Sequence, residues 1–232
     1  MLHKTYFNWS SGKDSAFALF FMLKDDSYNI SLLVTTINSH YNRVSMHGLR
    51  REVLEAQAKA LNIPLHIIEL PEMPSMEDYE CIMTKQMRLL KAQNFTYCGF
   101  GDIFLEDLKA YRDTNLKPYG IKAIYPLWKK DTKQLITQFL ELGFKTVIVC
   151  AKADYFNEDY VGQTITRELV ENLPENVDPC GENGEFHTFC YDGPIFKSPI
   201  NYKLGEKTYR EYDTPNLKDG KTGFWFCDII LN

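Results

Sequence analysis

The sequence predicts an α/β protein in which a parallel β-sheet with helices on both faces is followed by a smaller α+β region. In the first half, short apolar runs of strand length alternate with segments of helix length, as in right-handed βαβ units. From residue 186 onward, short β-like runs are separated by turns that contain Pro or Gly, which is typical of antiparallel hairpins. With 232 residues and 44% apolar residues, the chain is long enough to bury a sizeable core.

The first half is expected to contain five strands and four helices. The strand candidates are apolar runs of the kind covered on both faces: Lys4–Trp9, Ile30–Thr35, Leu65–Glu69, Tyr97–Phe100 and Lys122–Tyr125. The helix candidates lie between them: Asp14–Lys24, His47–Leu61, Ser75–Gln93 and Leu105–Pro118. The third helix is the best marked, because Ser75 and Asp78 form a capping box at its start.

The second half is expected to begin after Trp128, which divides the chain into domains at 1–128 and 129–232. Asp131 caps a helix over Asp131–Leu142, and Gly143 ends it. The remaining candidates are a strand at Lys145–Ala151, a helical stretch near Gly162–Asn172, and hairpin strands at Phe186–Tyr191, Tyr202–Tyr212 and Gly223–Leu231.

The segment Ser10–Ser15, with the sequence SSGKDS, follows the first strand and opens the first helix. Backbone N–H groups gather at a helix N-terminus and the helix dipole favours negative charge there, so a phosphate group is the expected ligand. The segment is not a Walker A loop, because that motif needs a Gly at Phe7 and a hydroxyl at Asp14. The alternative is an ordinary strand–turn–helix with Ser as the N-cap.

A second unusual segment is Asp178–Thr188, with the sequence DPCGENGEFHT. Its glycines bracket a turn that presents carboxylates, an imidazole and a hydroxyl within a few residues. On composition alone, a solvated surface turn is the alternative.

Together the two segments resemble a known family. Ser10–Ser15 is similar to the SGGxDS loop of the ATP pyrophosphatase (PP-loop) superfamily, which cuts ATP between its α and β phosphates; Ser11 replaces the first Gly. Asp178–Thr188 resembles the GEGGE(F/Y)xT signature of the diphthine–ammonia ligase family, with Asn183 in place of a Gly. Further matches extend the resemblance to about Lys197: His47-Gly48, Gly101–Ile103, Tyr111-Arg112, Pro126–Trp128 and Asp192–Phe196.

The resemblance implies a Rossmann-like adenine nucleotide α-hydrolase domain that binds ATP at 1–128, and a smaller substrate-binding domain at 129–232. It implies a ligase that adenylates a carboxylate, transfers ammonia to form an amide, and releases AMP and pyrophosphate. In better-known members the carboxylate belongs to diphthine on translation elongation factor 2. The second motif resembles that of compact bacterial-type members, in which diphthamide is not expected, so the acceptor is left open as a protein side chain or a small molecule.

Residues of the first motif, with neighbours from the second strand and helix, are expected to bind ATP. They are Ser10, Ser11, Gly12, Lys13, Asp14, Ser15, Thr35, Thr36 and His47. Asp14 is also expected to hold Mg²⁺.

Five further residues are expected to be catalytic: Asp102, Arg112, Glu182, Glu185 and His187. Asp102 follows the fourth strand and should face the same crevice as the first motif. Arg112 is suited to bind a phosphate or a substrate carboxylate. The alternative to this binding role is a surface salt bridge with Glu106 or Asp113. Glu185 is the preferred group to bind ammonium and remove its proton.

Composition excludes several classes of protein. The net charge of −5 and the lack of a basic tract make a nucleic-acid partner unexpected. There is no run of eighteen apolar residues and no signal peptide, so we expect no membrane contact and a cytoplasmic location. The six cysteines form no C-x-x-C pair, which argues against a zinc ribbon or a redox pair. A homo-oligomer is left open.

Two other functions remain as alternatives. One is a PP-loop thiolation enzyme, which Cys180 would serve as nucleophile, although neither a C-x-x-C pair nor a basic surface supports it. The other is a regulator that binds ATP without chemistry, and the replacement of a loop Gly by Ser11 is its main support. A plain scaffold protein would not explain both motifs.

Overall fold

A computed structural model describes residues 2–44, 47–213 and 220–232. The elements of its first half, in chain order, are β1 (His3–Asn8), α1 (Lys13–Leu23), β2 (Tyr28–Asn38), β3 (Arg43–Val44), α2 (Arg51–Leu61), β4 (Leu65–Leu70), α3 (Met76–Ala92), β5 (Tyr97–Gly99), α4 (Glu106–Leu116), a 3₁₀ turn (Lys117–Tyr119) and β6 (Lys122–Ile124). Those of its second half are α5 (Thr132–Glu141), β7 (Lys145–Lys152), α6 (Arg167–Glu171), β8 (Phe186–Asp192), β9 (Tyr202–Asp213) and β10 (Lys221–Leu231).

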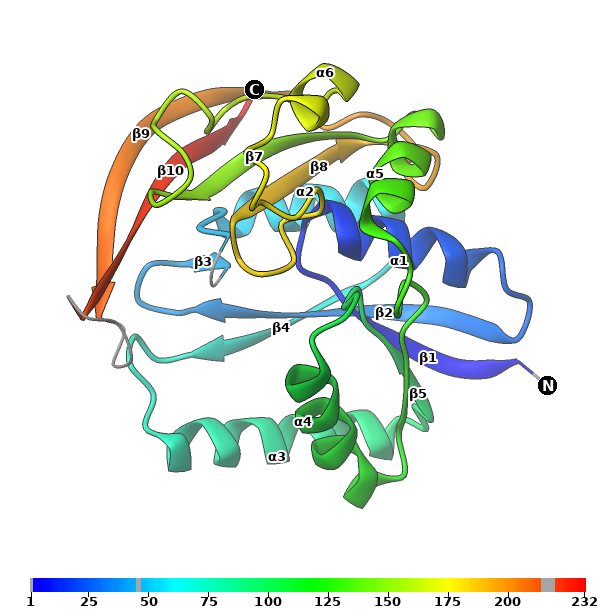
Figure 1. The fold of residues 1–232 in the computed structure, drawn as a ribbon. Coiled ribbons are helices and arrows are strands. Elements are labelled where there is room, and N and C mark those ends of the chain that lie inside the picture. Colours follow the sequence, from blue (N-terminus) through cyan, green and yellow to red (C-terminus); the bar gives the residue numbers. More distant parts are fainter. Residues whose placement is uncertain (1, 45–46, 214–219) are drawn as a thin grey trace.

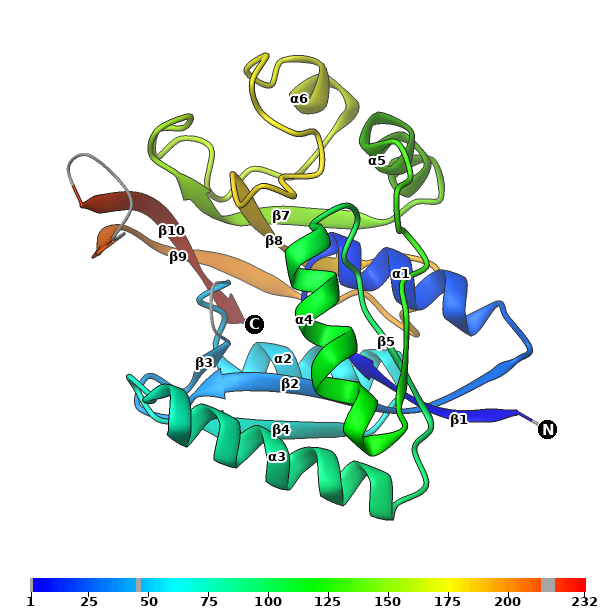
Figure 2. The same cartoon turned by 60° about the horizontal axis from the view of Figure 1, so that its bottom comes forward.

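The elements are stacked in layers (Figures 1 and 2). Helices α3 and α4 cover one face of the first sheet, and α1 and α2 cover its other face. The second sheet, built from β7 to β10, lies over α1 and α2, with α5 and α6 beyond it. The predicted fold class, a parallel sheet with helices on both faces and a second β-rich unit, is therefore confirmed.

The first sheet places the loop after β1 at its centre. The strands β4, β2, β1, β5 and β6 lie side by side and are all parallel, and β3 adds a short antiparallel pairing to β2. From β1 the chain builds the sheet first towards β2 and β4 and then towards β5 and β6. The carboxyl end of β1 is thus a topological switch point, where α/β proteins bind their ligands.

Helix α1 is apolar all round because it lies between the two sheets. Its buried residues include all of Ala16–Phe20, and Phe17 contacts Phe139 and Phe144 of the second half at ring-centroid distances of 5.7 and 6.0 Å. One hydrophobic core therefore contains residues from both sides of Trp128.

Two predicted helices begin later than expected. His47 lies in a turn, and α2 begins only at Arg51; the intervening Gly48 has a φ of +67°, which a helix does not accommodate. Gly162 likewise has a φ of +89°, and α6 starts at Arg167 behind the N-cap Thr166. Among the residues described here, no helix has the length and apolar character needed to cross a bilayer.

A single buried amide joins three parts of the fold. Gln57 of α2 is fully buried; its Oε1 accepts from the Trp9 indole N–H at 3.0 Å. Its Nε2 donates to the carbonyl oxygens of Ser11 at 3.0 Å and Cys190 at 2.7 Å. Gln57 thereby fixes the end of β1 and the loop after it to β8.

We expect Gln57→Leu to lower the free energy of unfolding by about 3 kcal/mol, because it strips a hydrogen-bond partner from three buried backbone and indole groups. Urea denaturation followed by circular dichroism measures the change. Gln134→Leu, on the exposed side of α5, is the matched control and should shift the free energy by less than about 0.5 kcal/mol. Equal effects of the two substitutions would contradict the cross-linking role.

Candidate active site

The two sequence motifs, far apart in the chain, meet at the N-terminus of α1. The Cys190 backbone N–H of β8 donates to the Ser11 carbonyl at 2.9 Å, and the Lys13 backbone N–H donates to Thr188 Oγ1 at 3.0 Å. The Lys13 ammonium also donates to the carbonyl oxygen of Cys180. The segment around Cys180–Cys190 is therefore seated directly on the loop after β1.

The Ser10–Ser15 loop is held by its own hydroxyls. The Ser15 hydroxyl accepts from the Ser10 N–H at 3.1 Å, and the Ser10 hydroxyl accepts from the Gly12 N–H at 3.4 Å. Ser11 has a φ of +75° and is fully buried, and its hydroxyl has no hydrogen-bond partner. Gly12 is the N-cap of α1 and supplies no side-chain cap.

Two glycines allow close approaches around this helix end. A Cβ on Gly12 would lie 2.9 Å from His47 Cε1 and 3.2 Å from the Thr188 carbonyl oxygen. A Cβ on Gly101 would lie 2.9 Å from the backbone of Asp14 and Ser15. The 2.9 Å distances are shorter than real Cβ contacts, so glycine at these positions lets the neighbouring segments pack against the start of α1.

Opposite charges surround the helix end. The Lys13 ammonium, 3% exposed, pairs with the Asp14 carboxylate at 2.7 Å, and the Asp14 side chain is 31% exposed. Glu182 reaches the loop after β5, where its Oε1 accepts from the Ile103 N–H at 2.7 Å. Burial, assisted by the nearby charge of Asp14, raises the pKa of Glu182 to about 7.

Asp102 and Arg112 form an ion pair beside this cluster. Arg112 Nη2 donates to Asp102 Oδ1 at 3.1 Å, and Arg112 Nε lies 3.0 Å from Asp102 Oδ2. The guanidinium also lies over the Phe100 ring, 4.4 Å from its centroid. The expected alternative partners of Arg112 are used elsewhere, since Asp113 accepts from Tyr125 and Glu106 pairs with Lys129.

His47 and His187 lie next to each other, with ring centroids 4.9 Å apart. His47 Nδ1–H donates to the Thr188 carbonyl at 3.0 Å, and His187 Nε2 is buried without a partner. Burial lowers the pKa of His47 to about 4 and that of His187 to about 3, and the charge of Lys13 acts in the same direction. Both imidazoles are neutral at neutral pH.

Three predicted residues have structural partners in this arrangement. Glu185, 2% exposed, accepts from the backbone N–H groups of Asp178 at 3.0 Å and Asn183 at 2.9 Å, so it holds its own loop together. The Thr35 hydroxyl donates to the Trp9 carbonyl at 2.6 Å. Thr36 pairs with Ile68 between β2 and β4, one residue closer to the carboxyl end of the sheet.

The cysteine of the second motif is held as part of the core. Cys180 is 3% exposed, and its thiol donates to the Thr132 carbonyl at 3.4 Å. Burial raises the pKa of this thiol well above its usual range. A thiolate is therefore disfavoured, which removes the support of Cys180 for sulfur transfer.

No metal cage is built into the described part of the chain, where no group of three or more His, Cys, Asp or Glu side chains is placed to hold an ion. This donor set still fits Mg²⁺ that arrives with a nucleotide, since such ions use one or two carboxylates together with phosphate oxygens. Asp14, predicted to hold this ion, is half-buried and its carboxylate is paired with the Lys13 ammonium.

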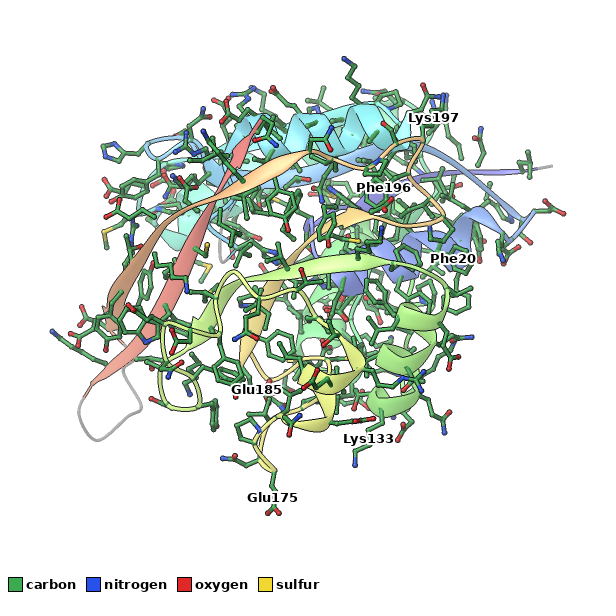
Figure 3. The ribbon with its side chains drawn as sticks, turned by 90° about the horizontal axis from the view of Figure 1, so that it is seen from above. Phe20, Lys133, Glu175, Glu185, Phe196 and Lys197 are labelled. Carbon is green, nitrogen blue, oxygen red and sulfur yellow. The ribbon has the colours of Figure 1, made fainter. Side chains whose placement is uncertain are left out.

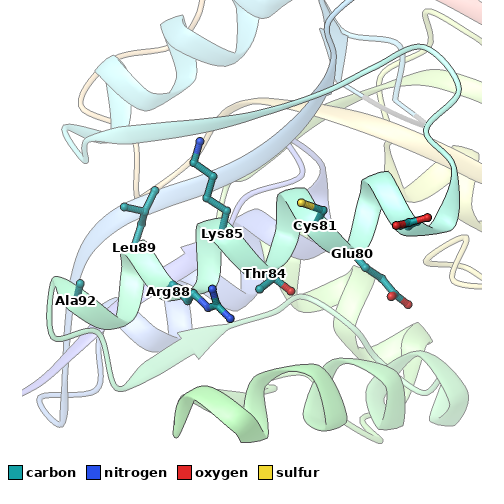
Figure 4. Close-up of a pocket in the computed structure, with 8 residues that line it drawn as sticks. Glu80, Cys81, Thr84, Lys85, Arg88, Leu89 and Ala92 are labelled. Carbon is teal, nitrogen blue, oxygen red and sulfur yellow. The ribbon is translucent and has the colours of Figure 1, made fainter.

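Two surface cavities lie away from this site. One, of about 650 Å³, runs along α3 and is lined by residues spaced along one helix face, among them Cys81, Lys85 and Leu89 (Figure 4). The other, of about 390 Å³, is lined by residues near α6 such as Tyr160 and Leu169. Neither contains a residue predicted for the site.

Sequence reasoning missed Gln57, which binds the Ser11 carbonyl. Its signal was present, because Gln57 stands at helical spacing with the buried Val53, Leu54 and Leu61 and is the polar residue in that apolar stripe. Arg43, Arg50 and Asp228, which hold the turn that carries His47, gave no such signal.

Comparison with protein families gives two consecutive matches. Residues 3–123 match the diphthamide synthase N-terminal domain, and residues 131–218 match the diphthamide synthase C-terminal domain.

Curated relatives carry one common name. Diphthine–ammonia ligase of Schizosaccharomyces pombe is 28% identical over 101 residues, covering 40% of this chain and 17% of that protein. The enzyme of the same name from Mus musculus is 28% identical over 116 residues, covering 47% of this chain and 43% of that protein. The match thus spans less than half of either relative.

Solved structures give weaker likenesses. A predicted subunit of tRNA methyltransferase from Methanocaldococcus jannaschii has a TM-score of 0.40 and 17% identity, over 68% of this chain and 83% of that one. The U34-tRNA thiolase NcsA from Methanococcus maripaludis has a TM-score of 0.36 and 16% identity, over 61% and 58% of the two chains.

We expect Ser11→Gly to raise the free energy of unfolding by about 1 kcal/mol, because Gly adopts the positive φ without the steric cost of a Cβ. Urea denaturation measures the change. Ser11→Ala is the control: it removes the unpartnered hydroxyl but keeps the Cβ, so its effect isolates the hydroxyl. A Ser11→Gly protein less stable than the Ser11→Ala protein would contradict backbone strain at this position.

We expect the stability of the wild-type protein to fall as pH rises, relative to Glu182→Gln. The pKa of Glu182 is about 7 in the folded chain against an ordinary value of 4.5, so its contribution to stability is fully present below pH 4.5 and is lost as pH rises through 7. Urea midpoints at pH 4.5, 6 and 8 measure the difference. Glu175→Gln, whose side chain projects from the surface in Figure 3, should follow the wild type. Parallel pH profiles of wild type and Glu182→Gln would contradict the assignment.

Proposed function

We propose that this chain, which belongs to the diphthamide synthase family, is an ATP-dependent ligase that activates a carboxylate as an acyl-adenylate and transfers ammonia to it. The observation that carries the proposal is the meeting of the Ser10–Ser15 loop and the Asp178–Thr188 segment at one helix end, at the switch point of a parallel sheet. Activity, substrates and partners are proposed here for the chain itself, because it matches less than half of each named relative.

The start of α1 supports binding of the ATP phosphates. The N-cap Gly12 supplies no side-chain cap, and Thr188 takes up the Lys13 N–H, so the helix dipole and the remaining first-turn amides offer positive potential to an anion. The partly exposed Ser10 and Asp14 mark the side from which phosphates reach this turn, since Ser11 and Lys13 are buried. Mg²⁺, held by Asp14 when bound, would neutralise phosphate charge there.

We propose that the nucleoside part of ATP contacts residues that border the loop after β1 or the end of β2. They are Thr35, Thr36 and His47.

The first chemical step joins the acceptor to AMP. A carboxylate oxygen of the acceptor attacks the α-phosphorus of ATP, the bond from that phosphorus to the β-bridging oxygen breaks, and pyrophosphate leaves with the electron pair. Lys13 is the cation closest to the helix end, and it stabilises negative charge that develops on the phosphates. Arg112, oriented by Asp102, is proposed to hold the acceptor carboxylate, a task that suits its planar fork.

The second step forms the amide. Ammonia attacks the acyl carbon, the bond to AMP breaks, and the surplus proton on nitrogen passes to a base. Glu182 is the preferred base, because its pKa of about 7 lets it accept a proton near neutral pH. His187, neutral and with an unpartnered Nε2, is proposed to accept a hydrogen bond from ammonia, since its lowered pKa makes it a weak base. We propose that Glu185 acts by holding the loop that carries Glu182, since both of its oxygens bind that loop.

Titration calorimetry with α,β-methylene-ATP and Mg²⁺ tests the nucleotide site. We expect the wild type to bind the analogue and Asp14→Asn to bind at least tenfold more weakly, because the variant loses the charge placed for the metal. Asp107→Asn, on the exposed first turn of α4, is the matched control and should bind as the wild type does. Absence of binding to the folded wild type would overturn the proposed function.

A second measurement tests the chemistry. Pyrophosphate release from ATP, in the presence of a candidate carboxylate, should depend on ammonium and should rise with pH, with a midpoint near pH 7 and a plateau above about pH 8, as Glu182 ionises. In Glu182→Gln the rate should fall by about 10²-fold or more, which is the usual contribution of a general base. A rate independent of ammonium would contradict amide formation.

A further inference from the structure

Asp228 of β10 binds two arginines of the turn region before α2. Its Oδ1 lies 2.8 Å from Arg43 Nη1, and its Oδ2 accepts from Arg50 Nη2 at 2.6 Å and Arg50 Nε at 3.0 Å. The Asp228 side chain is 16% exposed. The residue lies beyond position 218, where the match to the family's C-terminal domain ends.

The local irregularity of the hairpin places Asp228 for this contact. The β9–β10 register shifts between Cys227 and Ile229, so Asp228 has no paired residue on β9. Gly205 lies opposite, and a Cβ there would be 3.0 Å from the Asp228 Cβ. Burial acts to raise the pKa of Asp228, but the hydrogen bonds and charges of Arg43 and Arg50 hold that pKa at about 2. The contact is therefore an ion pair at every pH at which the protein is expected to work.

The contact continues to the predicted nucleotide loop. Arg43 Nη1 also donates to the Gly48 carbonyl at 2.6 Å, and the Phe226 ring packs on Gly48, 3.2 Å from where its Cβ would be. The neighbouring residue, His47, binds the Thr188 carbonyl and lies against Gly12. Thus β10 contacts the turn region in two ways, through the Asp228–Arg43 ion pair and through the Phe226 ring.

We propose that Asp228 is a positioning residue: through Arg43 and Gly48 it fixes the turn at 47–50 and holds the His47 imidazole against Gly12 of the phosphate loop. A carboxylate is required because it neutralises one of two neighbouring guanidinium groups while bonding to both. The consequence for nucleotide affinity rests on the proposed function, whereas the placement of His47 does not.

The first test follows the His47 imidazole by ¹H–¹⁵N NMR during a pH titration. In the wild type His47 should keep one neutral tautomer with Nδ1 protonated and titrate near 4. In Asp228→Asn its pKa should rise by at least one unit towards 6.5, because the released ring gains water while Lys13 and His187 remain the titratable groups that face it. An unchanged tautomer and pKa in Asp228→Asn would overturn the proposal.

Matched variants separate positioning from a general loss of fold. Asp192→Asn is the control, because Asp192 is also a half-buried strand aspartate in an ion pair, with Lys145 at 2.9 Å, at the end of β8 in the same sheet. It should leave the tautomer and the pKa of His47 as in the wild type.

Arg43→Gln is a second test, which applies even if Asp228→Asn fails to fold. It keeps the Arg50–Asp228 pair and replaces the guanidinium bonded to Gly48, so it should shift the His47 pKa as Asp228→Asn does. The shifts of the His47 pKa caused by Asp228→Asn and Arg43→Gln should be less than additive in the double variant. Strict additivity would overturn the pathway through Arg43.

The affinity for α,β-methylene-ATP with Mg²⁺ tests the consequence. We expect Asp228→Asn to bind five- to tenfold more weakly than both the wild type and Asp192→Asn. An equal affinity alongside a displaced His47 would overturn the link to the nucleotide. Failure of the wild type to bind the analogue would count against the proposed function, and the NMR titration would still decide the placement of His47.

Discussion

The arrangement depends on one backbone oxygen, the carbonyl of Ser11. It accepts from the Cys190 N–H of the second sheet and from the Gln57 amide of α2, so three segments converge on a single peptide group. To point that carbonyl at β8, Ser11 adopts a left-handed conformation that is costly for a residue with a Cβ. The surrounding contacts must over-determine this geometry, and the buried Gln57 is the clearest part of that support. The location of the charged groups then follows, since Lys13 is attached to the same loop.

In the charged cluster, side chains of the same type differ in their burial and in their hydrogen-bond partners. Glu182 and Glu185 stand three residues apart, but Glu185 has its oxygens satisfied by its own loop, whereas Glu182 extends to the loop after β5 and has a pKa near neutrality. The two histidines lie beside a buried ammonium and stay neutral, so Lys13 is the positive charge nearest to the helix end. The charge near the start of α1 is thus carried by a few side chains, each held by defined hydrogen bonds or ion pairs.

The sequence predicts the strands of the two sheets well. It predicts poorly the junction between them, where the second sheet and the helices of the first half are in contact. All five parallel strands and the antiparallel tail follow from apolar runs and turn residues, because such local patterns record burial on one or two faces. The resemblance of the two motifs to one family predicts that Lys13 and Glu182 belong to one site. The turn at His47 was wrongly included in a helix, since the effect of Gly48 depends on a tertiary contact with Phe226. Asp228 and Gln57 act across the junction, and no local pattern reports which strand will face which helix.

The position of α1 between two sheets has a consequence for how the halves of the chain relate. A helix with apolar residues on every side has no face suited to water, so the first half alone would present Phe17, Phe20 and their neighbours as an adhesive surface. Residues on both sides of Trp128 pack into one hydrophobic core. Because one core spans Trp128, a substitution that changes the volume of a core side chain on one side of this residue has to be accommodated by its neighbours on the other side.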